Sequence, residues 1–215
     1  MSARAADAGP LRRGIAVERW TIGWMLVEAA VSLGAGAAAG SVALLAFGAD
    51  SVIELISAGV LLRRLRLEQA GGGGVRLETS ERRASAIVGA LLFLLALWVA
   101  GSALRDLLLH ARPARSPLGL ALAAASTAIM PWIVAVKRRV APSIGSAALR
   151  ANAACGMVCA YTAGTLLIGM ALRTWLGWWW ADPLAALGIV YFVVREGREA
   201  VEAARGRADG CGCDD

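Results

Sequence analysis

Long uninterrupted apolar segments are the feature of this sequence that most restricts its fold. Six segments, rich in Ala, Leu, Val, Gly and Trp, are each about 20 residues or longer, the length an α-helix needs to cross about 30 Å of hydrocarbon. They cover residues 17–38, 41–62, 85–108, 117–136, 146–172 and 182–201. The chain is 58% hydrophobic, more than the roughly 45–50% of soluble domains. The sequence therefore predicts an all-α, polytopic membrane protein with six transmembrane helices.

The positions of the Lys and Arg residues predict the orientation, because cytoplasmic loops retain positive charge. One side holds Arg4, Arg12, Arg13, Arg19, Arg63, Arg64, Arg66, Arg76, Arg82, Arg83, Lys137, Arg138, Arg139, Arg195, Arg198, Arg205 and Arg207. The other side holds only Arg105, Arg112, Arg115 and Arg173, a bias of about four to one, and Arg150 lies near the start of the fifth segment. We expect both termini in the cytoplasm and a multi-pass cell-membrane protein, in the cytoplasmic membrane if the cell is prokaryotic. Binding of nucleic acid is not expected, because the charges are spread over four loops.

The apolar segments also predict the domain organisation. Residues 1–16 form a cytoplasmic N-terminal segment, residues 17–201 a transmembrane domain with an Arg- and Gly-rich cytoplasmic loop at 63–84, and residues 202–215 a cytoplasmic, Cys-containing tail. The first apolar segment is not a cleavable signal peptide, because a second one follows it directly. The sequence GAGAAAG between these two segments predicts a tight link between closely packed antiparallel helices.

Two carboxylates within the second apolar segment are the first candidates for function. Asp50 and Glu54 are four residues apart, so they lie on one face of a helix, one turn from each other. A charged group in hydrocarbon costs several kcal/mol and usually marks a functional site. A single carboxylate could instead make a structural hydrogen bond, but a pair at this spacing is suited to binding one cation.

Two thiols in the fifth apolar segment repeat this spacing. Cys155 and Cys159 would place two sulfur atoms on one face of another helix. Together with Asp50 and Glu54 they would form a four-coordinate tetrahedral site, which suits zinc and also accepts cadmium. The alternative is that the thiols are buried as small apolar side chains.

Other polar residues have weaker indications of function. Glu28 and Asn152 are expected to make hydrogen bonds between helices, with a role along an ion path as the alternative. Cys211 and Cys213 in the tail could capture metal or could be exposed thiols that the cytoplasm keeps reduced.

Residues at the expected non-cytoplasmic side have structural interpretations. His110 is expected at the membrane interface, and Trp178, Trp179 and Trp180 are expected to form an aromatic belt there. Asp182 is expected to cap the last helix, with Pro183 in its first turn.

Three segments carry a resemblance to a known family. GSVALLAFGADSVIEL, SAALRANAACGMVCAY and WWWADPLAALGIVYFVVREG are similar to the second, fifth and sixth spans of the cation diffusion facilitator family, which exports zinc and related divalent metals. Asp50 and Glu54 occupy the places of the family's ligands in span two. Cys155 and Cys159 stand where the family has His and Asp in span five. The chain also stops where the family usually adds a cytoplasmic metal-binding and dimerising domain.

The resemblance implies a function in transport rather than catalysis. It implies alternating access with export of zinc or cadmium from the cytoplasm in exchange for protons, with no cofactor. The metal ligands would be Asp50, Glu54, Cys155 and Cys159, and the partners would be metal ions, protons, the lipid bilayer and, through small-residue helix faces, a second copy of the chain. Thiolates in place of His and Asp would favour softer ions.

Two other function classes remain open from the sequence. The first is a membrane sensor or adaptor with the exporter fold and no transport. The second is a membrane thiol oxidoreductase that uses the four cysteines, although this class would leave Asp50 and Glu54 without a role.

Overall fold

The computed structural model describes residues 3–69, 75–111, 114–144 and 147–205, which form helices without any strand among them. The helices are α1 (Ala3–Ala39), α2 (Val42–Gln69), α3 (Val75–Leu108), α4 (Pro117–Val140), α5 (Ala147–Leu176) and α6 (Ala181–Ala204), with a short 3₁₀ helix, η1 (Ala141–Ile144), after α4. This confirms the predicted fold class.

Five of these helices are long and apolar enough to cross a membrane. Their candidate spans are Leu11–Ala39, Val42–Leu67, Gly89–Leu108, Pro117–Ile144 and Gly156–Leu176. Among the described residues α6 contains no candidate span, and Arg195, Glu196, Arg198 and Glu199 lie in its C-terminal half. The prediction of a polytopic membrane protein is confirmed, whereas the assignment of α6 as a sixth span stays a prediction.

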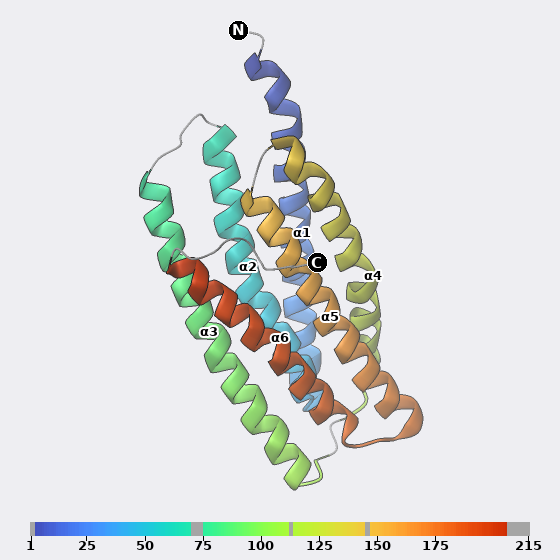
Figure 1. Ribbon diagram of the computed structural model, residues 1–215. Helices are drawn as coiled ribbons and strands as arrows, with labels where there is room; N and C mark the ends of the chain where they lie inside the picture. Colours follow the sequence, from blue (N-terminus) through green and yellow to red (C-terminus); the bar gives the residue numbers. More distant parts are fainter. Residues whose placement is uncertain (1–2, 70–74, 112–113, 145–146, 206–215) are drawn as a thin grey trace, which may run out of the picture.

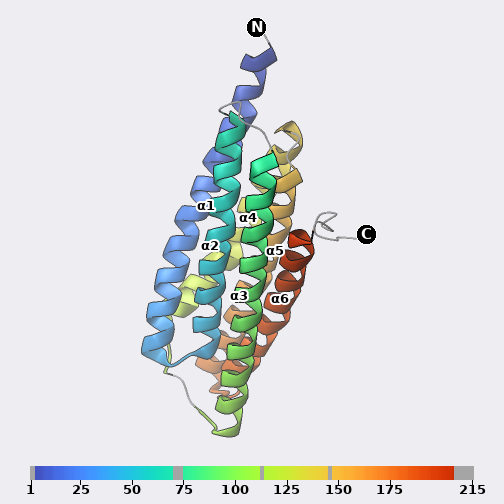
Figure 2. The same ribbon diagram turned by 90° about the vertical axis from the view of Figure 1, so that its left-hand side faces the viewer.

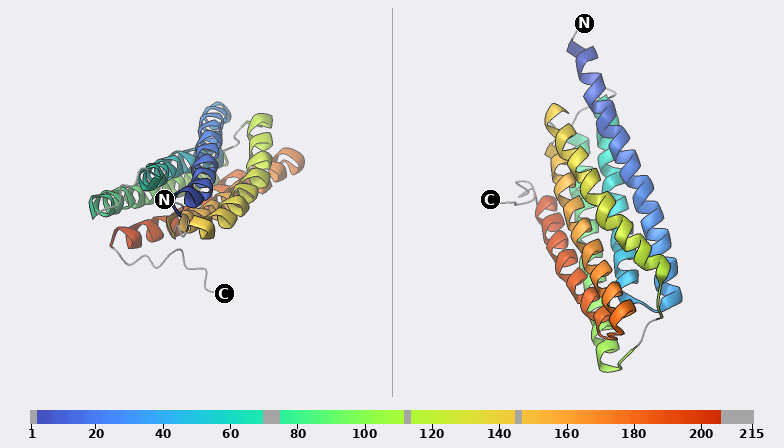
Figure 3. Two further views of the ribbon diagram at one scale, coloured as in Figure 1. Left: turned by 90° about the horizontal axis from the view of Figure 1, so that it is seen from above. Right: turned by 90° about the vertical axis from the view of Figure 1, so that its right-hand side faces the viewer.

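The six helices lie side by side along one long axis (Figures 1 and 2). The most extensive pairings are α1 with α2, α3 with α6, and α4 with α5, and α6 also contacts α5 and α2. The start of α1 lies at the same end of the bundle as the end of α2, the start of α3, the end of α4 and the start of α5, as the right-hand view of Figure 3 also shows for α1, α4 and α5. This alternation fits the predicted up-and-down order of the spans.

The region expected to be a long loop between the second and third spans is mostly helical. The second helix continues to Gln69 and the third begins at Val75, so of this region only residues 70–74, which include the four glycines of the expected Arg- and Gly-rich loop, lie outside the described residues. The reason lies in the sequence LLRRLRLEQ, since Leu, Arg, Glu and Gln are all good helix formers.

The predicted link between the first two spans is shorter than expected. Helix α1 continues through GAGAAA to Ala39, and the turn is made at Gly40, whose φ of 64° lies in the left-handed region that glycine adopts easily. The expected close packing of the two helices is present: a Cβ built at Gly48 on α2 would lie 2.9 Å from the Cβ of Ser32 on α1. The small residues therefore pack helix against helix instead of forming a loop.

Asp182 caps a different helix from the expected one. Helix α6 begins at Ala181, and the Asp182 carboxylate accepts a hydrogen bond of 2.6 Å from the Ser41 hydroxyl and one of 3.5 Å from the Ala43 amide. Ser41 Oγ in turn accepts from the Leu44 amide at 3.2 Å. These amides belong to the first turn of α2, where backbone N–H groups have no partner within the helix. The Asp182 carboxylate on α6, together with Ser41, therefore caps the N-terminus of α2.

Candidate functional site

The two carboxylates predicted on α2 are buried in the middle of the helix bundle. Asp50 is 1% exposed and Glu54 is 9% exposed. The helical repeat places both on one side of α2, as the spacing predicted. Asp50 Oδ1 has no hydrogen-bond partner among the described residues. The arrangement leaves carboxylate oxygen available inside the protein.

The thiol of Cys159 joins this pair from α5. Its Sγ donates a hydrogen bond to Oε2 of Glu54, and the side chain is 3% exposed. This bond directs the thiol of α5 toward α2. The second predicted thiol, Cys155, belongs to α5, but its side chain lies outside the described residues.

A third carboxylate that the sequence analysis missed comes from α6. Ligand oxygens of Asp50, Glu54 and Glu196 all lie within 4.8 Å of one another, and Glu196 is 7% exposed. Glu196 was not among the candidates from the sequence, where Arg195 and Arg198 flank it. One signal could have found it: Ile189, Val193 and Glu196 follow the i, i+4, i+7 spacing of a buried helix face.

Glu28 lies beside this group, on α1. Ser51, the neighbour of Asp50, places its Oγ 3.3 Å from Glu28 Oε1 and also donates to the Phe47 carbonyl at 2.9 Å. The expected interhelical hydrogen bond of Glu28 is therefore present. Its other oxygen, Oε2, is buried without a hydrogen-bond partner among the described residues, as is the Ser126 hydroxyl.

Asn152 belongs to a different polar cluster. Its Oδ1 accepts a hydrogen bond from Lys137 Nζ, and Lys137 also lies 2.9 Å from Glu18 Oε2. This confirms an interhelical role for Asn152, since the three residues connect α5, α4 and α1. Lys137 was expected among the loop charges, but its side chain is only 3% exposed. That expectation is wrong, because the last turn of α4 packs against α1 and α5.

The remaining residues singled out in the sequence lie away from the carboxylates. His110, with a φ of 51°, is exposed, and its ring centroid is 4.5 Å from that of Trp179. The rings of Trp178 and Trp180 stack at 4.8 Å. Cys211 and Cys213 lie outside the described residues, so their predicted role stays open.

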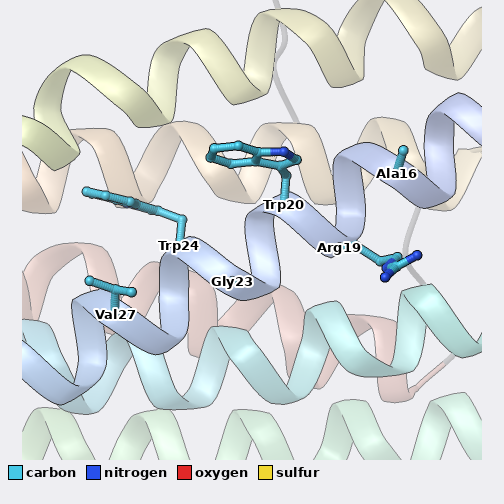
Figure 4. Close-up of a pocket in the computed structure, with 6 residues that line it drawn as sticks. All are labelled: Ala16, Arg19, Trp20, Gly23, Trp24 and Val27. Carbon is cyan, nitrogen blue, oxygen red and sulfur yellow. The ribbon is translucent and has the colours of Figure 1, made fainter.

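An open pocket of about 590 Å³ lies on the outer side of α1 and contains none of the candidate ligands. Figure 4 shows the Trp20 and Trp24 side chains on either side of Gly23, which leaves the hollow between them. Trp20 is 68% exposed. The pocket is therefore a feature of the outer surface and is separate from the carboxylates in the bundle.

The chemistry of the buried group favours a cation. Three carboxylates and one thiol can serve as metal ligands. Negative charges on neighbouring carboxylates repel one another strongly in a low dielectric, and a bound cation would offset that repulsion. Two oxygens on opposite sides of a cation bound at about 2.0–2.4 Å lie about 4–4.8 Å apart. The ligand oxygens of Asp50, Glu54 and Glu196 lie within 4.8 Å of one another, which is compatible with that geometry.

Comparison with known proteins agrees with this description. Residues 21–205 match the model of the cation efflux transmembrane domain. The chain is 33% identical over 180 residues to "Uncharacterized transporter sll1263" of Synechocystis sp., a match that covers 82% of this chain. The same match covers 58% of the relative, so the chain spans less than two thirds of the relative's length. The chain belongs to the cation efflux family, and the match extends over the helices that hold the buried carboxylates.

Proposed function

We propose that this protein carries divalent metal cations across the membrane and exports zinc or cadmium from the cytoplasm. The observation that carries the proposal is the burial of Asp50 and Glu54 on α2, with the Cys159 thiol bonded to Glu54, in a member of the cation efflux family. Carboxylates placed in the interior of a membrane protein are costly unless they bind a proton or a cation.

The mixed donor set supports the choice of metal. Thiolate favours zinc and cadmium over magnesium and manganese, whereas carboxylate oxygen is acceptable to all four ions. Cys159 supplies at least one sulfur beside two oxygens, and Cys155 remains a proposed second one. Because Cys159 stands where the family has Asp, its thiol favours transport of a softer metal ion such as zinc or cadmium.

Proton exchange follows from the same ligands. A thiol and a carboxylic acid must lose their protons before they bind a metal, so binding releases protons and protonation from the opposite side favours release of the metal. No histidine lies among the described ligands. We propose alternating access in which the site holds either metal or protons.

The experiment is metal flux into inverted vesicles or proteoliposomes with an imposed proton gradient. Zinc, cadmium, cobalt and manganese are compared for the native chain and for Asp50→Asn, Glu54→Gln and Cys159→Ala. Glu199→Gln is the matched control, because Glu199 is an acidic residue of α6 that pairs with Arg195 at 3.1 Å on the helix surface. We expect saturable zinc or cadmium flux that the three site variants abolish and the control retains.

Two other outcomes would change the proposal. Absence of flux for every ion, in folded and correctly inserted protein, would overturn transport and favour the sensor or adaptor function. Flux that is unchanged when a protonophore removes the gradient would overturn proton coupling alone. The predicted cytoplasmic termini and the metal-capturing role of Cys211 and Cys213 can be tested in the same vesicles, by protease access to the ends of the chain and by serine replacement of both thiols.

A further inference from the structure

Helix α6 contributes a carboxylate to the interior of the bundle at the level of the α2 pair. The ligand oxygens of Asp50, Glu54 and Glu196 lie within 4.8 Å of one another, and all three side chains are at most 9% exposed. A structural role for Glu196 alone would not require it to approach two other carboxylates. Three carboxylates held this close in a low dielectric favour a cation bound between them.

The buried group still lacks part of its hydrogen bonding. Asp50 Oδ1 is buried without a hydrogen-bond partner among the described residues, and an unpaired buried acceptor costs about 1–3 kcal/mol. The nearby ammonium of Lys137 is already bound to Glu18 and Asn152. A carboxylate oxygen that is buried and unpaired beside two further carboxylates points to a cation as its partner.

We propose that Glu196 is a metal ligand and that the cargo site is built from three helices: Asp50 and Glu54 from α2, Cys159 from α5 and Glu196 from α6. This inference rests on the proposed transport function and extends it. The sequence predicted ligands on α2 and α5 only, with oxygen and sulfur in equal number. A third carboxylate makes the donor set richer in oxygen, which favours zinc over more thiophilic ions such as copper(I).

Ligation by α6 also has a structural consequence. The residue after Glu196, Gly197, packs against α3, since a Cβ built there would lie 3.4 Å from Leu92 Cβ and from the Phe93 ring. From the α3 side, a Cβ built at Gly89 would lie 3.2 Å from the Gly197 carbonyl oxygen. Helices α3 and α6 are therefore closely packed, and a metal held by Glu196 joins this pair to α2 and α5.

The test is equilibrium binding of zinc to the full chain in lipid nanodiscs, measured by calorimetry. The variants are Glu196→Gln, which removes the charge, and Glu196→Asp, which keeps the charge on a shorter side chain. Asp50→Asn is the positive control and Glu199→Gln the negative control, because Glu199 lies on the same helix and pairs with Arg195. X-ray absorption at the zinc edge counts oxygen and sulfur neighbours in the native chain and in Glu196→Gln.

We expect Glu196→Gln to weaken zinc binding roughly ten- to hundredfold and Glu196→Asp to weaken it less. We also expect one fewer oxygen neighbour in Glu196→Gln, with the sulfur contribution retained. The inference is overturned if Glu196→Gln binds zinc like Glu199→Gln while Asp50→Asn does not bind, a result that leaves the proposed function intact. Failure of the native chain itself to bind zinc would overturn both.

A folding defect can be separated from a lost ligand. A Glu196 variant that has lost its structure would fail to give the native elution profile and the native helical circular dichroism, and Glu196→Asp then decides the question. If a folded Glu196→Asp binds zinc more weakly than the native chain and than Glu199→Gln, Glu196 is a ligand. If a folded Glu196→Asp binds zinc with the affinity of the native chain and of Glu199→Gln, Glu196 is not a ligand.

Discussion

The Lys137 ammonium on α4 lies 2.9 Å from the Glu18 carboxylate on α1, and the two side chains are 3% and 0% exposed. Lys137 also donates a hydrogen bond to Asn152 on α5. The three residues connect α1, α4 and α5, and Lys137 lies in the last turn of α4. A buried ion pair of this kind fixes the relative positions of its helices, because neither charge is stable there alone.

Removal of the ammonium should therefore be strongly destabilising. We expect Lys137→Met to lower the free energy of unfolding by about 3–5 kcal/mol, because Glu18 stays buried without its partner. Unfolding in mixed detergent micelles measures this change. Arg139→Met, which alters an exposed residue in the same turn, should change stability by less than about 0.5 kcal/mol. In the double variant Glu18→Gln, Lys137→Met much of the loss should be recovered, and equal losses in the single and double variants would contradict the pairing.

The hydrogen bond between Asp182 and Ser41 predicts an energetic coupling between the start of α6 and the start of α2. Asp182→Ala should cost about 1–3 kcal/mol, because it leaves the Ser41 hydroxyl and the Ala43 amide without their acceptor. Once Asp182 is Ala, the further change Ser41→Ala should cost much less than it does in the native chain. A double-mutant cycle from chemical unfolding measures this coupling, and additive effects would argue against it.

Two glycines of α5 should respond in opposite ways to the same substitution. A Cβ at Gly169 would lie 2.3 Å from the Ala185 Cβ on α6, whereas a Cβ at Gly164 would meet no atom within 4 Å. We expect Gly169→Ala to destabilise the protein by about 1–3 kcal/mol through overpacking, and Gly164→Ala to be neutral or stabilising by up to about 1 kcal/mol. Thermal unfolding of the two variants provides the comparison, and similar behaviour would show that α5 and α6 are not in this contact.

The Cys159 thiol should determine the preference between cadmium and zinc. In Cys159→Ser a hard hydroxyl replaces the soft sulfur, so cadmium binding should weaken more than zinc binding, with a change in the affinity ratio of about tenfold or roughly 1.4 kcal/mol. Competition between the two metals measures the ratio directly. Tyr161→Phe, on the exposed side of the same helix, is the control that should leave the ratio unchanged.

Ser51 and Ser126 should differ because one hydroxyl has hydrogen-bond partners and the other has none among the described residues. Ser51→Ala loses contacts with Glu28 and the Phe47 carbonyl and should cost about 1 kcal/mol. Ser126→Ala removes a buried hydroxyl near Glu28 that has no well-formed hydrogen bond, and it should cost less than Ser51→Ala. Unfolding free energies of both variants check the difference, and an equal loss in Ser126→Ala would show that its hydroxyl is bonded to Glu28 or to a bound water molecule.

The sequence by itself determined the features that depend on local periodicity. Apolar segments long enough to span a bilayer predicted the helices, and a spacing of four residues placed Asp50 and Glu54 on one face of α2, because the helical repeat is a property of the backbone alone. The same repeat places Glu196 on one face of α6 with Ile189 and Val193, but it does not say that this face packs toward Asp50 and Glu54 on α2.

The tertiary structure decided the contacts between residues far apart in the sequence. Asp182 caps α2 rather than its own helix, Lys137 is paired inside the bundle rather than exposed in a loop, and Glu196 approaches the α2 carboxylates. Each outcome depends on which helices become neighbours and on how each is rotated about its axis. The neighbours of each helix and its rotation about its axis depend on the packing of many small residues at the same time. No single segment of the sequence specifies that packing.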